Sequence, residues 1–268
     1  MKLFFRQSGQ GDPLIILHGL FGSSDNWYTL AKVFAQKYTV FLVDQRNHGQ
    51  SPHSEDHNYA LLTEDLKDFV AEYSINKPVI MGHSMGGKTA MNFAVKYPDK
   101  LSKLIVVDIV PKKYPIHHDA ILEGLKAIPL QTVPSRNEAD RLLSQYVPEA
   151  DVRQFLLKNL ARKAEGGFEW KINVAAIDQN IEAMGEGLVY SGKYDGPSFF
   201  IRGEKSNYYA EGDEALIKSI FTKAEFATLA TGHWVQAEKP EEFASVVMNY
   251  LSKSQTTFAT YFFSISKL

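Results

Sequence analysis

The sequence predicts an α/β protein with a mainly parallel central sheet flanked by helices. Short apolar runs alternate along the chain with longer amphipathic stretches, which is the pattern of strand, helix and strand in a parallel sheet. The segments that join them are brief and rich in Gly, Asn, Asp and Pro, as crossover turns are. With 268 residues, the chain is long enough to bury one large core.

Six apolar runs are predicted strands, and three amphipathic stretches between the earlier runs are predicted helices. The strands are Leu14–Leu17, Thr39–Val43, Pro78–Met81, Lys103–Val107, Ser198–Ile201 and Glu225–Leu229. The helices are Asn26–Gln36, Thr63–Tyr73 and Met85–Lys96.

The strand pattern stops between Pro111 and about Lys193, where the apolar residues take helical spacing. Because strands resume at Pro197, this segment predicts a helical cap inserted into one sheet, over the carboxyl edge where open α/β folds bind ligands. We therefore expect a core of residues 1–110 and 194–252 and a cap of residues 111–193. A tail, 253–268, is expected to be flexible or artificial in origin.

The composition narrows the classes of partner and leaves the oligomeric state open. A formal charge of −2 without a basic stripe predicts a small-molecule substrate and no nucleic acid. The absence of cysteine excludes thiolate nucleophiles and disulfides. The apolar run Leu3–Phe5 is too short for a signal peptide, and about 18 apolar residues never run together. We expect a cytoplasmic protein without stable membrane insertion.

The segment Gly82-His83-Ser84-Met85-Gly86 fits the G-x-S-x-G motif of a nucleophilic serine. It follows a predicted strand and precedes a predicted helix, which is the context that the motif requires. Gly82 and Gly86 supply the small residues that a strained strand-to-helix turn needs. Ser84 is therefore the predicted nucleophile, whereas Lys88 on the following helix is expected to be solvated.

The segment His18-Gly19-Leu20-Phe21-Gly22 ends the first predicted strand, where this kind of site has its second oxyanion amide. We predict the backbone N–H groups of Leu20 and Met85 as the two donors, with Phe21 as the second choice beside Met85. The Phe21 side chain is also expected to contact substrate. His18 is a tempting base, but a histidine at a strand end is more simply structural and bonded to backbone. The same interpretation applies to His48 and His83.

The segment Gly232-His233-Trp234 follows the last predicted strand and makes His233 the predicted general base, with Trp234 at the substrate. The order of serine, acid and histidine along the chain agrees with this assignment. The other histidines are expected at the surface, and their spacing fits no known metal motif, so we expect neither metal nor cofactor. These histidines are His53, His57, His117 and His118.

The acid has two candidates. In many such enzymes it lies in the loop after the penultimate strand, but the usual position in that loop holds Ser206. Asp108 ends the strand Lys103–Val107 at the carboxyl edge, and Glu204 lies in the later loop. We favour Asp108 over Glu204 as the partner of the imidazole.

Five segments together resemble the α/β-hydrolase superfamily and, more closely, small bacterial esterases of the YbfF type. They are Leu17–Trp27, Asp44–Ser51, Gly82–Lys88, Val107–Pro111 and Gly232–Pro240. The resemblance implies a helical cap inserted after the sixth strand, in the usual numbering of that fold, above a catalytic serine. It also implies the earlier placement of the acid and hydrolysis of acyl esters, with acyl-CoA thioesters as a further class.

The motifs and the resemblance predict a serine esterase that forms an acyl-enzyme on Ser84. Two alternatives remain open. One is a lyase or haloperoxidase-like enzyme on the same scaffold, since one fold hosts many chemistries. The other is a ligand receptor that keeps the catalytic triad but turns over negligibly.

Overall fold

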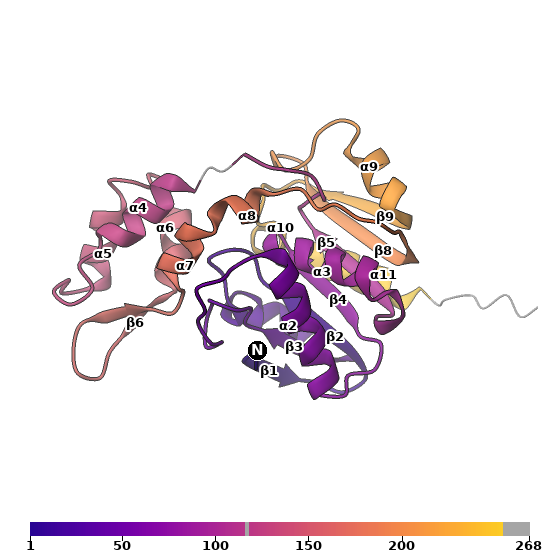
Figure 1. Ribbon diagram of the computed structural model, residues 1–268, viewed down its shortest axis with the longest axis horizontal. Helices are drawn as coiled ribbons and strands as arrows, with labels where there is room; N and C mark the ends of the chain where they lie inside the picture. The colour runs from indigo at the N-terminus through magenta and orange to yellow at the C-terminus, as the bar shows by residue number, and fades with distance from the viewer. Residues whose placement is uncertain (116–117, 254–268) are drawn as a thin grey trace, which may run out of the picture.

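The computed structural model describes residues 1–115 and 118–253. Its centre is a seven-stranded sheet of order β1-β3-β2-β4-β5-β8-β9 (Figure 1). β1 runs antiparallel to β3, and the other neighbours are parallel. The strands of this sheet are β1 (Phe5–Ser8), β2 (Asp12–Leu17), β3 (Tyr38–Val43), β4 (Val79–His83), β5 (Lys103–Val107), β8 (Tyr194–Gly203) and β9 (Phe221–Leu229).

Helices cover both faces of the sheet, as the sequence predicts. α2, α3 and α9 contribute to the core on one face, and α1 and α11 to the core on the other. The helices that accompany the sheet are α1 (Tyr28–Phe34), α2 (Tyr59–Glu72), α3 (Met85–Lys96), α9 (Asp213–Ile220), α10 (Val235–Glu238) and α11 (Pro240–Ser252), with short 3-10 turns η1 (Ser24–Trp27) and η2 (Pro98–Lys100).

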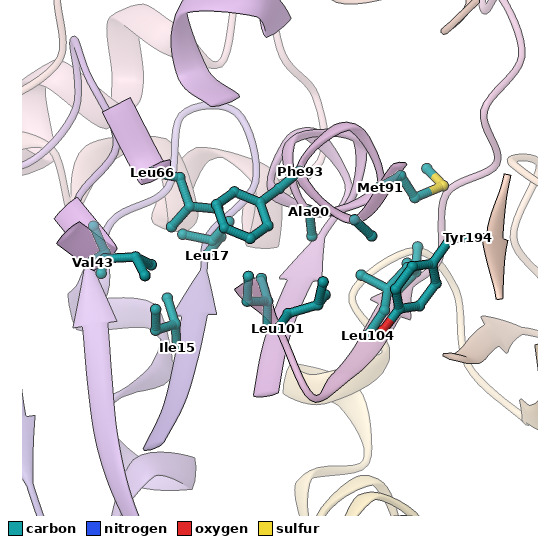
Figure 2. Packing of buried hydrophobic residues seen from close by; sticks show 14 of the residues in the cluster. Ile15, Leu17, Val43, Leu66, Ala90, Met91, Phe93, Leu101, Leu104 and Tyr194 are labelled. Atoms are coloured by element: carbon teal, nitrogen blue, oxygen red, sulfur yellow. The ribbon is translucent and has the colours of Figure 1, made fainter. Parts of the chain in front are cut away.

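The central strands are buried on both faces, which explains their unbroken apolar runs. In β2, Ile15 and Leu17 pack on the side of α2 and α3, whereas Leu14 and Ile16 pack on the side of α1 and α11. Figure 2 shows the first side, where Leu17 lies beside Phe93 of α3.

The segment between β5 and β8 holds five short helices and a two-stranded hairpin (Figure 1). The hairpin corrects the expectation that this segment is purely helical. Its strands pair over three residues each, too few to show a period of two in the sequence, and Gly166 and Gly167 at positive φ form its turn. These elements are α4 (Asp119–Ala127), α5 (Arg136–Leu143), α6 (Ala150–Leu157), β6 (Leu160–Arg162), β7 (Phe168–Trp170), α7 (Val174–Gln179) and α8 (Ile181–Gly185).

Other differences from the sequence prediction concern the strands of the sheet. β1 was not predicted, and β8 and β9 begin four residues earlier than expected. Apart from Lys253, the expected tail lies outside the described residues. Within the described part of the chain, none of the helices has the length and apolar character needed to cross a membrane.

Candidate active site

The loops that carry the predicted site residues follow four parallel strands of the sheet. Leu20 comes after β2, Ser84 after β4, Asp108 after β5, and His233 after β9. Because parallel strands end at the same edge, the fold brings residues far apart in sequence to one place.

Ser84 occupies a strained turn between β4 and α3. Its backbone angles are φ 52° and ψ −116°, a conformation that side-chain-bearing residues rarely adopt. A Cβ added at Gly82 would lie 2.1 Å from the carbonyl oxygen of Gly86, and one at Gly86 would lie 2.5 Å from that of Leu17. The predicted need for small residues on both sides of the serine is thus confirmed.

Asp108 lies beside His233, with its Oδ2 oxygen 2.7 Å from the imidazole Nδ1. The aspartate side chain is fully buried. Its Oδ1 accepts a hydrogen bond of 2.8 Å from the Gly203 amide, and its Oδ2 accepts another from the Ser206 hydroxyl. The competing candidate, Glu204, is exposed, and no hydrogen bond joins it to His233 among the described residues.

Ser206 is a site residue whose contact the sequence reasoning missed. It occupies the loop position where many such enzymes carry the acid. A polar side chain at that position was the feature of the sequence that could have indicated the contact with Asp108. A hydroxyl in this position can stabilise a carboxylate delivered from the neighbouring strand, because a hydrogen bond to a charged acceptor is stronger than one between neutral groups.

Two other rings pack against the His233 ring. Tyr208 stacks on it, with centroids 3.9 Å apart and planes 16° apart, and the His83 ring lies 4.6 Å away. His83 Nε2 donates a 2.9 Å hydrogen bond to the His233 carbonyl. With Nδ1 bonded to Asp108, Nε2 of His233 is the nitrogen left to exchange a proton.

The predicted oxyanion amides differ in how they are engaged. The Phe21 amide, our second choice, donates to His48 Nε2 at 3.2 Å. The Leu20 amide donates no hydrogen bond within the described part of the chain. Met85 is the first residue of α3, where an amide has no acceptor within its own helix. Of the three predicted amides, those of Leu20 and Met85 are therefore the two that are free to donate to a substrate oxygen.

Three of the histidines near the site are structural, as predicted, and bond to backbone. His18 Nδ1 donates to the Gly19 carbonyl at 2.8 Å, while its Nε2 accepts from the Gln45 amide at 3.0 Å. His48 Nδ1 donates to the Arg46 carbonyl at 2.9 Å. Burial lowers the pKa of His18, His48 and His83, so that these rings stay neutral.

Two of the histidines expected at the surface are covered, one fully and one in part. His57 is fully buried, and burial is the main cause that lowers its pKa to about 4. His118 lines the cavities at Ser84. His53 is exposed as expected, and His117 lies outside the described residues. Within residues 1–115 and 118–253, no cluster of three or more His, Asp or Glu side chains is suited to a metal.

Two cavities meet at Ser84. The larger, of about 200 Å³, is lined by His233, Trp234, Phe21 and Phe155 among others, so both predicted substrate contacts lie at it. The smaller, of about 50 Å³, is lined by Met85, Tyr59, Tyr114 and Lys88 among others. Four residues line both cavities: Leu20, Ser84, His118 and Tyr208.

Lys88 corrects an expectation, because its side chain is 1% exposed rather than solvated. It follows Ser84 by four residues, which places it one helical turn further along α3. That face of α3 is covered by Tyr59 and by the segment before β8. Because both are far from Lys88 in the sequence, the residues around Lys88 could not indicate its burial.

Comparisons with known proteins agree with this architecture. The family model described as alpha/beta hydrolase fold matches residues 12–240. The chain is 38% identical over 248 residues to the sn-1-specific diacylglycerol lipase ABHD11 of Mus musculus, covering 89% of this chain and 80% of that protein. It is 35% identical over 260 residues to Esterase YbfF of Escherichia coli, covering 94% and 100%.

A solved structure described as a marine microorganism esterase superposes with a TM-score of 0.91 at 42% identity, covering 93% of this chain and 99% of that one. The similarity to YbfF-type esterases and the predicted α/β-hydrolase fold, with its mainly parallel sheet flanked by helices, are confirmed. The chain is an enzyme of the hydrolase class and belongs to the α/β-hydrolase family.

Proposed function

We propose that this protein is a serine esterase that hydrolyses acyl esters through an acyl-enzyme on Ser84. The observation that carries the proposal is the 2.7 Å contact between His233 Nδ1 and the buried Asp108 carboxylate, with His233 and Ser84 lining one cavity. A nucleophile, a base and a group that orients the base are the parts that serine hydrolysis needs.

In the acylation step, Ser84 Oγ attacks the ester carbonyl carbon and its proton passes to His233 Nε2. Asp108 stabilises the imidazolium that forms and holds the neutral ring with its proton on Nδ1. The negative charge on the carbonyl oxygen is taken up by the Leu20 and Met85 amides, whose donors are fixed before the reaction begins.

Collapse of the tetrahedral intermediate breaks the bond to the alcohol oxygen, which leaves with the proton from His233. Water then attacks the acyl-enzyme, with His233 again as base, and releases the acid and the free serine. Every proton in this cycle moves within the set of Ser84, His233, substrate and water, so the mechanism uses no cofactor.

Residues 111–193 act in this proposal as a cap, with residues 1–110 and 194–252 as the catalytic core. The support is that Ile121, Val152, Phe155 and Leu156 from this segment line the larger cavity together with core residues. Their apolar side chains suit an uncharged ester group. Thioesters react by the same steps and form the second substrate class of the proposal.

The test is multiple turnover of p-nitrophenyl acetate by the parent protein and by Ser84→Ala. We expect sustained turnover by the parent, a loss of at least about a thousandfold in the variant, and single labelling of the parent at Ser84 by a fluorophosphonate. Stoichiometric release without turnover would favour the receptor alternative. Turnover that survives the substitution would remove Ser84 from the mechanism.

A further inference from the structure

Lys88 is a buried cation that lines the smaller cavity. Its Nζ donates a 2.5 Å hydrogen bond to the Glu186 carbonyl and lies 5.3 Å and 5.0 Å from the ring centres of Tyr59 and Tyr114. An ammonium group has three protons to donate, and the carbonyl takes one. The rings provide a favourable surface for the charge but accept no strong hydrogen bond.

No carboxylate forms an ion pair with Lys88 in the described part of the chain. Glu186 accepts the hydrogen bond from Lys88 through its backbone carbonyl. Its own carboxylate lies 4.0 Å from the Nζ atom of Lys113. A buried charge is costly unless an opposite charge accompanies it. An anion entering the smaller cavity would supply that charge.

The position of His233 decides which part of an ester enters each cavity. The departing alcohol oxygen must receive its proton from His233, so the alcohol lies on the side of that residue. His233 lines the larger cavity, whereas Met85 and Lys88 line the smaller one. The acyl group is therefore directed into the smaller cavity.

The smaller cavity limits the length of the acyl chain. At about 15 Å³ for each water-sized group, its 50 Å³ holds about three such groups. An acyl chain that fills this space ends near the buried ammonium. A carboxylate at that end would pair with the ammonium, whereas a methyl group would leave it unpaired.

We propose that Lys88 is a specificity residue that selects short acyl groups ending in a carboxylate, so that the preferred substrates are monoesters of short dicarboxylic acids with an apolar alcohol. This inference rests on the proposed esterase function and assigns the acyl side of the same site. The larger cavity, with Trp234 and Phe155, takes the alcohol.

The experiment compares monobenzyl succinate with benzyl butanoate, whose acyl chains have the same number of carbons and differ at the end group. Release of benzyl alcohol, followed by chromatography, gives kcat/KM for each ester at pH 7. We expect the parent protein to favour the succinate by at least about tenfold. Lys88→Met should lower the ratio of the two values by at least about tenfold, since the substitution removes a desolvated charge partner at similar side-chain length.

Lys96→Met is the matched control, because Lys96 lies on the same helix, is exposed, and lines neither cavity at Ser84. It makes the same change in net charge and should leave the ratio unchanged. A Lys88 that merely ties α3 to the segment before β8 would affect both esters alike. The ratio therefore separates substrate recognition from a structural role.

A second readout needs no variant. Burial lowers the pKa of Lys88 to about 8, so the preference for the anionic ester should decline as the pH rises past about 8 and the ammonium loses its proton. The other titratable groups around Lys88 are Tyr59 from α2, Tyr114 and His118 after β5, Tyr208 after β8, and Glu186. Burial raises the pKa of all three tyrosines, and the ratio of two esters cancels groups that act on both.

Equal or better use of benzyl butanoate by the parent would overturn the inference, as would a ratio unaffected by Lys88→Met. The esterase proposal would survive either result, provided that turnover still depends on Ser84. If the parent turns over neither benzyl ester and does not turn over p-nitrophenyl acetate, both proposals are overturned together.

Discussion

The Ser206 hydroxyl and His233 Nδ1 both bond to the same Oδ2 oxygen of Asp108. The Gly203 amide bonds to the other oxygen, so the loop after β8 fixes a carboxylate that is delivered from the end of β5. This division of labour makes separate predictions for the carboxylate, for the hydroxyl and for the acidic residue next in the loop.

Asp108→Asn should lower kcat by a hundredfold or more. The amide would favour the wrong imidazole tautomer and could not stabilise the imidazolium. The equivalent change in the Ser-His-Asp triad of serine proteases lowers kcat by about four orders of magnitude. Glu204→Gln is the control, because Glu204 is exposed in the same region and should change kcat by less than about tenfold. Steady-state hydrolysis of p-nitrophenyl acetate measures both. A crippled Glu204→Gln beside an active Asp108→Asn would reverse the assignment of the acid.

Ser206→Ala should lower kcat by about tenfold. A hydrogen bond to a charged group contributes about 1.5–3 kcal/mol, and we expect part of this to appear in the transition state, where the aspartate must hold the imidazolium. Ser206→Thr keeps the hydroxyl and should recover most of the rate, while Ser219→Ala, at an exposed serine of α9, should have no effect. If Ser206→Ala lowers the melting temperature without changing kcat, the hydroxyl contributes to stability alone.

Motifs that depend on local geometry were predictable from the sequence. Ser84 needed only its own turn and its two glycines, and the mainly parallel sheet followed from the alternation of apolar and amphipathic segments. Asp108 and Glu204 could not be separated in this way, because their distances to His233 depend on how β5, β8 and β9 lie side by side.

Burial was the property that the sequence predicted least well. Lys88 and His57 carry polar side chains, which are exposed in most proteins, and both are buried here. Lys88 is covered by residues near positions 59, 114 and 186, and His57 lies 5.5 Å from the His48 ring. Such long-range coverage leaves no periodic trace near the residue that it covers.

Gly86→Ala should destabilise the turn that holds the nucleophile. The new Cβ would lie 2.5 Å from a backbone carbonyl oxygen of β2, which cannot move without disturbing the sheet. Overpacking costs about 1–3 kcal/mol, so the melting temperature should fall by about 5 °C, with activity lost. Gly192→Ala is the control, because only the Val95 side chain lies near its added Cβ, at 3.9 Å. Equal melting temperatures for the two variants would show that the turn tolerates the methyl group.

His57 should make the fold sensitive to acid. Its Nε2 is buried without a hydrogen-bond partner among the described residues, and its pKa is lowered to about 4 by burial, then by Arg46 and His18. The unfolded chain protonates this histidine near pH 6.5, so between about pH 6.5 and 4 the unfolded state binds more protons than the folded state. The stabilising contribution is therefore complete above pH 6.5 and is lost as the pH falls through this window, at up to about 1.4 kcal/mol per pH unit.

His57→Gln removes the titrating group, so its free energy of unfolding should fall less than that of the parent between pH 7 and pH 4.5, by about 2 kcal/mol. Urea unfolding at the two pH values measures this difference. The other buried histidines are present in both proteins, so their own titrations largely cancel in the comparison. His53→Gln, at an exposed histidine, is the control and should follow the parent. If His57→Gln loses as much stability in acid as the parent does, the buried imidazole is not the source of the sensitivity.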